Sequence, residues 1–295
     1  RLREYAAFHL HHEYYNMEFF GETYFTPPMP RSYAPVMTLA TVPMVTLALF
    51  AAGVCLRGRA LWRKIEAFDP AQTAVLWALG VLVNYVFWLR SSTPIFGGTK
   101  HWMTAYPFLA LFAGAGLAAA AASLRRALGR RASAIGARLG GFARSGGVQL
   151  AALGCLAFAA PIAETAHSHP WGLSSYVPLV GGAPGAATLG LNRTFWGYTT
   201  GSVVDWLNAN APRGASVYVH DTASPAWEML RRDKRLRPDI RGVGTVVGAD
   251  FALYHHEPHM EGQEYQAWGV YGTDQPAFVA GLDGVPVIWV YRRAR

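Results

Sequence analysis

The sequence predicts a membrane-embedded, all-α bundle of about four transmembrane helices with an interfacial helix, followed by a small soluble α/β domain. Hydrophobic residues make up 52% of the 295 residues and charged residues only 15%, whereas soluble domains carry about 25% charged residues. Apolar runs long enough to cross a bilayer, which needs about 20 residues, alternate with short basic segments. After residue 163 charged and apolar residues mix, as is typical of a domain in water.

Four uncharged runs define the predicted transmembrane region, residues 33–163. A buried helix of a soluble protein is also apolar, but four such runs in one chain favour membrane spans. The predicted spans are residues 33–56, 70–89, 102–124 and 145–163.

The basic segments between these runs orient the spans. Residues 57–69 hold four Lys or Arg, and residues 125–144 hold six. The positive-inside rule places both segments in the cytoplasm, and therefore places residues 1–32, the 90–101 loop and residues 164–295 outside. Topology thus accounts for the net charge of +8, and we expect no nucleic-acid partner. The Ala, Gly and Arg content indicates a bacterial inner (plasma) membrane with a periplasmic C-terminal domain.

Residues 1–32 predict an outer interfacial helix and a proline-rich connection. Aromatic residues and a histidine recur every three or four positions, which places them on one helical face: Tyr5, Phe8, His12, Tyr15 and Phe19. Such a helix is too polar to span but fits a membrane interface. The four prolines between Pro27 and Pro35 then predict a stiff, extended link into the first span.

The extracytoplasmic domain, residues 164–295, shows strand and helix patterns in alternation, which predicts an α/β layer domain. The predicted strands are residues 215–221, 249–256 and 285–293. The predicted helices include residues 224–236 and a short one over 274–282.

The stretch "TPIFGGTKHWMTAYPFLA" carries the first candidate site. Lys100 and His101 follow Gly97 and Gly98, whose backbone freedom allows close approach to a ligand. At headgroup depth the two side chains are placed to bind a lipid phosphate. Alternatively, Lys100 reaches to the interface as an anchor and His101 belongs to the aromatic belt. Arg90 is a second candidate phosphate ligand, with simple anchoring as its alternative.

Two histidine-rich stretches are candidates for ligand binding. His9, His11, His12 and Glu13 form a patch that suits a divalent metal, or a sugar or lipid-phosphate contact by His12 or Glu13. The alternative is a set of interfacial histidines that bind loops and headgroups. The stretch "HHEPHMEG", residues 255–262, matches no zinc spacing and reads as a loop. We therefore expect no required metal, and a divalent ion remains an alternative.

Three stretches taken together resemble one protein family: "PPMPRSYAPVMTLATVP", "TPIFGGTKHWMTAYPFLALFAG" and "GLNRTFWGYTTGSVVDWLNANAP". They are similar to membrane glycosyltransferases that use polyprenyl- or dolichyl-phosphate sugars, of the protein-mannosyltransferase type and GT-C class, which are related to the aminoarabinose lipid A transferases. The resemblance covers roughly residues 1–210. Where the family often has Arg-His, this chain has Lys100-His101, and lysine lacks the bidentate grip of arginine on phosphate.

The resemblance implies transfer of a sugar, with inversion, from a polyprenyl-phosphate donor to a protein, lipid or glycan acceptor in the cell envelope. It also implies a catalytic carboxylate in the first outer loop, which we expect upstream of residue 1 in a longer protein. The competing hypothesis is a membrane-anchored α/β protein that binds an extracytoplasmic ligand or partner without catalysis. A transporter is disfavoured because Asn84 is the only strongly polar residue well inside a predicted span.

Overall fold

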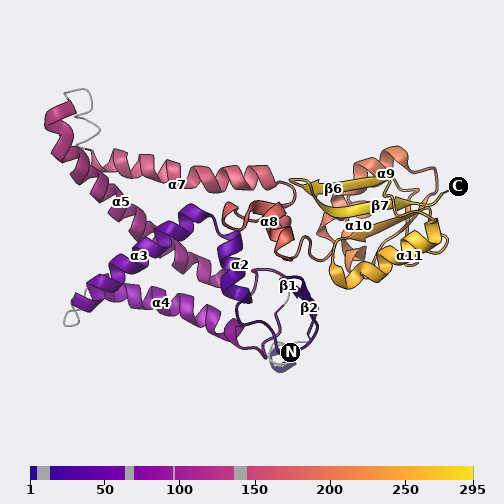
Figure 1. The fold of residues 1–295 in the computed structure, drawn as a ribbon, viewed down its shortest axis with the longest axis horizontal. Helices are drawn as coiled ribbons and strands as arrows, with labels where there is room; N and C mark the ends of the chain where they lie inside the picture. Colours follow the sequence, from indigo (N-terminus) through magenta and orange to yellow (C-terminus); the bar gives the residue numbers. More distant parts are fainter. Residues whose placement is uncertain (5–13, 64–69, 96, 136–144, 295) are drawn as a thin grey trace.

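The computed structural model describes residues 1–4, 14–63, 70–95, 97–135 and 145–294. The chain is mostly helical, at 58%, with a small sheet region. Figure 1 shows an elongated molecule, with long helices at one end and an α/β domain with the C-terminus at the other.

Among the described residues, three helices are long and apolar enough to cross a membrane. They are α3 (Met44–Arg63), α5 (Tyr106–Ile135) and α7 (Gly146–Ser168). Helix α4 (Pro70–Val86) and the 3-10 turn that follows it form a shorter apolar stretch, Thr73–Leu89. Membrane-length helices are thus present in three of the four predicted regions, and the chain has the character of a membrane protein.

Several predicted span boundaries were wrong. Helix α3 continues to Arg63, past the predicted end at residue 56, and α7 continues to Ser168, past residue 163. The first span does not begin at residue 33, because α2 (Tyr33–Thr41) ends at Thr41 and α3 starts at Met44. Pro43 lies between them and cannot donate the backbone hydrogen bond that a continuous helix needs. The basic segment predicted as a loop from residue 125 is helical as far as Ile135, where α5 ends.

Helices α3 and α5 pack through glycine. A Cβ atom on Gly53 would collide with the carbonyl oxygen of Phe112, and one on Gly116 would collide with that of Leu49. Small residues at such positions let two backbones approach closely, which is how helices associate where burial from water gives no driving force. The ring of Phe112 also meets Phe50 edge-on, with centroids 5.8 Å apart.

The C-terminal parts of α3 and α5 carry basic residues. Figure 1 shows the C-terminal ends of both helices at the end of the molecule opposite the α/β domain. Arg57 and Arg59 lie in the last turns of α3, and Arg125 and Arg126 lie in the second half of α5. The sequence predicted this separation of basic segments and domain, while the side of the membrane that each faces stays a prediction.

The N-terminal segment contains a β-hairpin where a helix was predicted. Strands β1 (Met17–Phe19) and β2 (Glu22–Tyr24) pair antiparallel. The helix prediction is therefore wrong from Tyr14 onward: residues 14–16 are not helical, and Phe20 and Gly21 both adopt positive φ and form a tight turn. Residues 2–4 are helical, and residues 5–13 of the predicted helix lie outside the described residues.

The C-terminal domain contains a five-stranded mixed sheet in the order β4-β3-β5-β7-β6. Its strands are β3 (Ser216–Tyr218), β4 (Arg241–Val243), β5 (Phe251–His255), β6 (Phe278–Leu282) and β7 (Val285–Arg292). Strand β3 runs parallel to β4 and β5, whereas β7 runs antiparallel to β5 and β6. The three predicted strands are confirmed. The helix predicted over 274–282 is wrong, because Asp283 and Gly284 form a tight turn that pairs β6 with β7.

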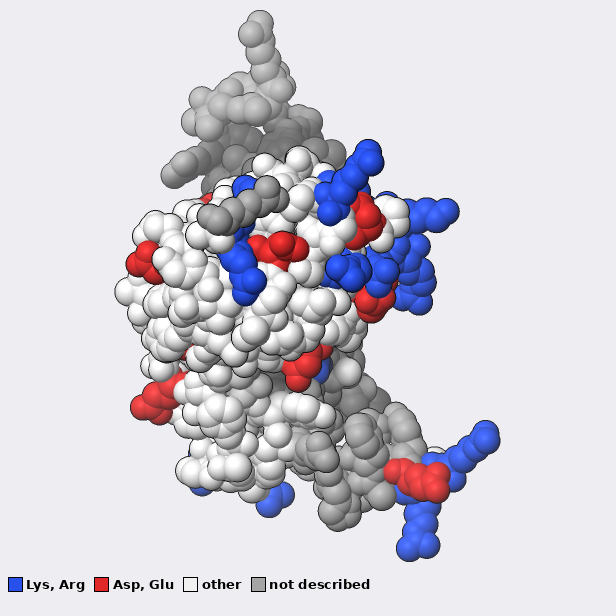
Figure 2. All heavy atoms as spheres, turned by 90° about the vertical axis from the view of Figure 1, so that its right-hand side faces the viewer, with Lys and Arg blue, Asp and Glu red and all other residues white. Residues whose placement is uncertain are grey.

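Helices cover both faces of this sheet. One core contains side chains of α9 (Val204–Asn210) and α10 (Ser224–Arg232), among them Leu207 and Trp227. The other contains Ala267 and Tyr271 of α11 (Glu261–Tyr271). The domain therefore has the three-layer α/β architecture that alternating helices and strands predict. Its outward face carries Lys and Arg together with Asp and Glu (Figure 2).

Candidate functional site

The loop over residues 90–102 is fixed to the helices by buried side chains. Ile95 and Trp102 are completely buried. The indole Nε1 of Trp102 donates a hydrogen bond to the hydroxyl of Thr38 on α2, at 3.0 Å, and that hydroxyl also lies 2.6 Å from the hydroxyl of Tyr85. Because these anchors hold the loop, residues 97–101 are presented in a defined position.

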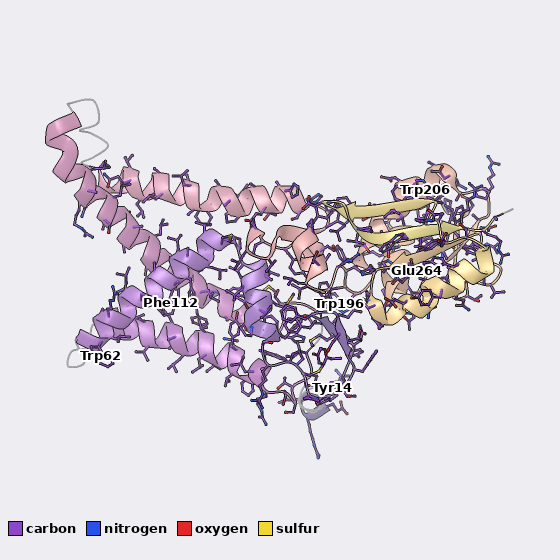
Figure 3. The ribbon with its side chains drawn as sticks, viewed as in Figure 1. Tyr14, Trp62, Phe112, Trp196, Trp206 and Glu264 are labelled. Atoms are coloured by element: carbon purple, nitrogen blue, oxygen red, sulfur yellow. The ribbon has the colours of Figure 1, made fainter. Side chains whose placement is uncertain are left out.

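Gly97 brings this loop against Trp196, about one hundred residues further along the chain. Gly97 and Gly98 both adopt positive φ, which glycine tolerates without strain. A Cβ atom on Gly97 would collide with the indole of Trp196. Trp196 itself has a φ of 51°, a conformation that costs about 1–3 kcal/mol for a residue with a side chain and recurs at functional sites. Figure 3 places Trp196 between the helices and the α/β domain.

Lys100 lies against this tryptophan and borders two cavities. Its Nζ is 4.4 Å from the centroid of the Trp196 ring, a cation–π contact. Partial burial lowers the pKa of Lys100. Lys100, Gly97, Phe195 and Trp196 line both cavities, so they form the boundary between them.

The first cavity, which we call the helix-side cavity, has a volume of about 500 Å³. Apolar side chains from α2, α7 and the adjoining loops dominate its wall, and they include Met37, Met103, Pro161, Leu173 and Val177. Glu164 of α7 is the one carboxylate among the described residues that line it. The cavity therefore combines an apolar wall with one acidic and one basic side chain.

The second cavity, which we call the sheet-side cavity, has a volume of about 520 Å³ and a more polar wall. Besides the shared residues, it is lined by Tyr15, Asn16, Asn192, Thr222, Pro225 and Glu257. Thr222 and Glu257 follow the carboxyl ends of β3 and β5, which are neighbouring parallel strands. The carboxyl edge of parallel strands is where α/β domains bind ligands.

Glu257 is an unusual carboxyl group. The residue is only 7% exposed, and its Oε1 has no hydrogen-bond partner among the described residues. Its Oε2 lies 3.6 Å from Nε2 of His259, whose Nδ1 lies 3.1 Å from Oε1 of Glu18. Burial raises the pKa of Glu257 to about 7, against the opposing effect of His259, and the charge of Glu18 raises it further. Glu257 can therefore hold or release a proton near neutral pH.

His255 helps to position the backbone next to Trp196, at the boundary between the two cavities. His255 is buried at the end of β5, and burial together with nearby His220 lowers its pKa to about 3. The Thr200 hydroxyl donates to the carbonyl of Gly197 at 2.5 Å, so it accepts the hydrogen bond from Nε2 of His255 at 3.0 Å. This neutral histidine thus helps to fix Gly197, directly after Trp196.

Of the residues predicted for phosphate binding, Lys100 alone lines these two cavities among those that the structure describes. The ring of His101 packs against Trp88, with centroids 4.5 Å apart. Arg90 is exposed at the end of the 3-10 turn after α4. His12 and Glu13 lie outside the described residues, together with His9 and His11.

Within the described residues, no group of three or more His, Cys, Asp or Glu side chains has the arrangement to hold a metal ion. Sequence reasoning did not select Glu257, Asn192 or Trp196 as site residues. Glu257 stands in the histidine-rich stretch 255–262, directly after a predicted buried strand, and that position is the signal that could have identified it.

Comparisons with known proteins do not assign the site. No protein-family model matches the chain, and no curated protein or solved structure matches it. The function must therefore be argued from the chemistry of the two cavities.

Proposed function

We propose that this protein is an integral-membrane glycosyltransferase that moves a sugar from a polyprenyl-phosphate donor to an acceptor hydroxyl at the outer membrane face. The observation that carries the proposal is the position of Lys100, at the boundary of an apolar cavity and a polar one. A lipid-phosphate sugar has the same order of chemistry: an apolar chain, an anion and a polyhydroxylated ring. The resemblance of residues 1–210 to transferases of this type points in the same direction.

The reaction needs a positive charge beside the phosphate, where the bond between the sugar and the phosphate oxygen breaks. The acceptor oxygen forms a bond to the anomeric carbon, while the bond from that carbon to the phosphate oxygen breaks and leaves its electron pair on the phosphate. The acceptor hydroxyl gives its proton to a base. In this proposal the ammonium of Lys100 binds the phosphate and stabilises the charge that grows on it as the bond breaks.

The donor chain would enter from the lipid-exposed helices. The helix-side cavity is bounded by α2 and α7, and α7 is one of the membrane-length helices. Its methionine and leucine side chains suit a branched hydrocarbon, because methionine adapts its shape to irregular apolar partners. Lys100 then lies where chain and headgroup meet, which is the depth expected for a phosphate at the membrane surface.

The test is sugar transfer in membranes that contain Lys100→Ala, Lys100→Arg or Arg90→Ala. We expect Lys100→Ala to lower turnover with a polyprenyl-phosphate sugar by about 10-fold to 100-fold, in the range seen when a transition-state donor is removed. Lys100→Arg should keep most of the activity because it keeps the charge. Arg90→Ala should have little effect, since Arg90 lines neither cavity. Unchanged turnover of Lys100→Ala at normal expression would reject the proposal.

The alternative, a membrane-anchored binding protein, rests on the sheet-side cavity alone. That cavity contains buried polar groups at a sheet edge, and binding needs no reacting donor. Specific binding of a ligand to this cavity, with no transfer from any polyprenyl-phosphate sugar, would favour the alternative.

A further inference from the structure

Two residues that line the sheet-side cavity each have a buried oxygen atom without a hydrogen-bond donor among the described residues. Oε1 of Glu257 and Oδ1 of Asn192 have no hydrogen-bond partner among the described residues. The two residues are 7% and 9% exposed, and both line the cavity. Buried acceptors of this kind are normally satisfied, and the exceptions mark places where another group binds.

The same cavity has an aromatic wall. Phe195 and Trp196 line it, with ring centroids 5.7 Å apart, and Trp196 remains 44% exposed although its backbone is held in a strained conformation. An exposed, rigidly placed aromatic face next to polar groups suits a ligand with one apolar and one polar surface. A sugar ring has both, because its C–H groups form one face and its hydroxyls point outward.

The charges around the cavity select against an ionic ligand. Glu257 on its wall, with Glu18 beyond His259, disfavours an anion. Lys100 at the boundary disfavours a cation. A neutral hydroxyl-rich ring avoids both penalties. Its hydroxyls donate to Asn192 and pair with Glu257 in either protonation state, since a hydroxyl is both donor and acceptor.

We propose that the sheet-side cavity is a sugar-binding subsite, in which Glu257 and Asn192 accept hydrogen bonds from ring hydroxyls and the aromatic wall packs against the ring face. This proposal rests on the proposed function in one respect: it places the sugar of the donor beside the phosphate at Lys100. It gives the α/β domain a direct role in substrate recognition.

The raised pKa of Glu257 makes this subsite sensitive to pH. A carboxyl group with a pKa of about 7 changes its proton content between pH 6 and 8. An ionised carboxylate is the stronger acceptor for a hydroxyl donor. Sugar affinity should therefore rise with pH through this range.

The first experiment measures binding of a panel of methyl hexopyranosides and pentopyranosides to the detergent-solubilised full chain by saturation-transfer NMR. We expect at least one glycoside to bind, and Glu257→Ala and Asn192→Leu to weaken its affinity by about tenfold or more. The matched control is Glu264→Ala, because Glu264 also has a raised pKa in the same domain but does not line the cavity. Glu257→Gln should keep binding and remove its pH dependence.

The second probe is a polyprenyl phosphate without a sugar, measured against the same variants and Lys100→Ala. If the phosphate binds through Lys100 while no glycoside binds, the sugar subsite is rejected and the proposed function survives. Glycoside binding that Glu257→Ala and Asn192→Leu leave unchanged also rejects the subsite. If glycosides bind as expected but the phosphate does not depend on Lys100, the proposed function fails instead. Hydrogen exchange in β5 and β7 shows whether each variant has kept its fold.

Discussion

Isoleucine behaves differently in the two halves of the molecule: Ile162 on α7 is 65% exposed, whereas Ile288 on β7 is completely buried. The same contrast holds for other apolar residues. Leu76 and Leu82 on α4 and Phe158 on α7 are more than half exposed, while Val217, Phe251 and Val290 in the sheet are buried. An apolar surface as large as that of the helices is covered by lipid in a membrane, so each half is built for a different surrounding.

The two halves are also held together by different means. Gly53 and Gly116 let α3 and α5 approach closely, and the buried core of the helical half lies instead around α2 and Trp102. The sheet is instead enclosed between two hydrophobic cores. The candidate site lies where the halves meet, near Trp196 in Figure 3. It has an apolar cavity on the side of the helices and a more polar cavity on the side of the sheet.

The largest expected effect is in the sheet core. Ile288→Ala should lower the free energy of unfolding of the α/β domain by about 2–5 kcal/mol, because it removes buried methyl groups and leaves a cavity. Ile162→Ala should change stability by about 0.5 kcal/mol or less, as expected for an exposed site. Denaturant unfolding of the full chain in detergent, followed by hydrogen exchange in each half, measures both. Equal losses from the two variants would break the comparison.

The next largest effect is on the pH dependence of stability, through Glu257, a buried carboxyl group of the α/β domain. Its pKa is raised from 4.5 to about 7, so the folded chain binds a proton more readily than the unfolded one. The stability from this group is full below pH 4.5 and is lost as the pH rises through about 7, a loss of about 3 kcal/mol. Unfolding measured from pH 5 to pH 8 should show this loss, and Glu257→Gln should remove it.

The control for this effect is the difference between wild type and variant. Burial lowers the pKa of both His255 and His256. Their contribution to the stability of the folded domain is therefore lost as the pH falls, which is opposite to the effect of Glu257. Both histidines are present in Glu257→Gln, and subtraction isolates the carboxyl group. Identical pH profiles for the two proteins would show that Glu257 titrates normally.

A smaller effect is expected where the helices approach. Gly116→Leu would force α3 and α5 apart and should cost about 1–3 kcal/mol, the usual range for overpacking. Gly114→Leu is the matched control, because a side chain there meets open space on the same helix. Thermal unfolding in detergent should separate the two variants. A loss from Gly114→Leu as large as that from Gly116→Leu would argue against close packing at this crossing.

Only part of the architecture could be predicted from the sequence. The spans over α3, α5 and α7 follow from uncharged length alone. Strand β5 follows from a short apolar run, and β7 follows from a run rich in Val and Ile. The break at Pro43 and the turn at Phe20-Gly21 were missed because apolar and helical periodicity continue across both. Strand β6 was missed because its short apolar run suits either a helix or a strand, and only pairing with β7 decides it.

The site was predicted in the same uneven way. Lys100 could be found because a cation beside two glycines, between two apolar runs, stands out locally. The sequence could not show that Glu257 lines the same cavity as Lys100. The two residues come to one cavity only because the fold brings the 90–102 loop to the end of β5. Trp196 carries no local signal, and its role depends on Gly97, distant in sequence.

The smallest expected effect is at the boundary itself. Trp196→Leu removes the aromatic face beneath Lys100, and the affinity for a polyprenyl phosphate should fall by about 2-fold to 5-fold, because an exposed cation–π contact contributes about 0.5–1 kcal/mol. Trp62→Leu, at an exposed position at the far end of α3, is the control. An equal fall for both variants would remove Trp196 from the site.

Photocrosslinking tests most directly whether a polyprenyl phosphate occupies the helix-side cavity and binds Lys100. The full chain is crosslinked to a polyprenyl phosphate that carries a benzophenone on its hydrocarbon chain, and the crosslinks are mapped by mass spectrometry. We expect crosslinks to Met37, Met103 or Leu173 in the helix-side cavity, and their loss in Lys100→Ala. Crosslinks confined to the exposed faces of α4 and α7, and unaffected by Lys100→Ala, would contradict this expectation.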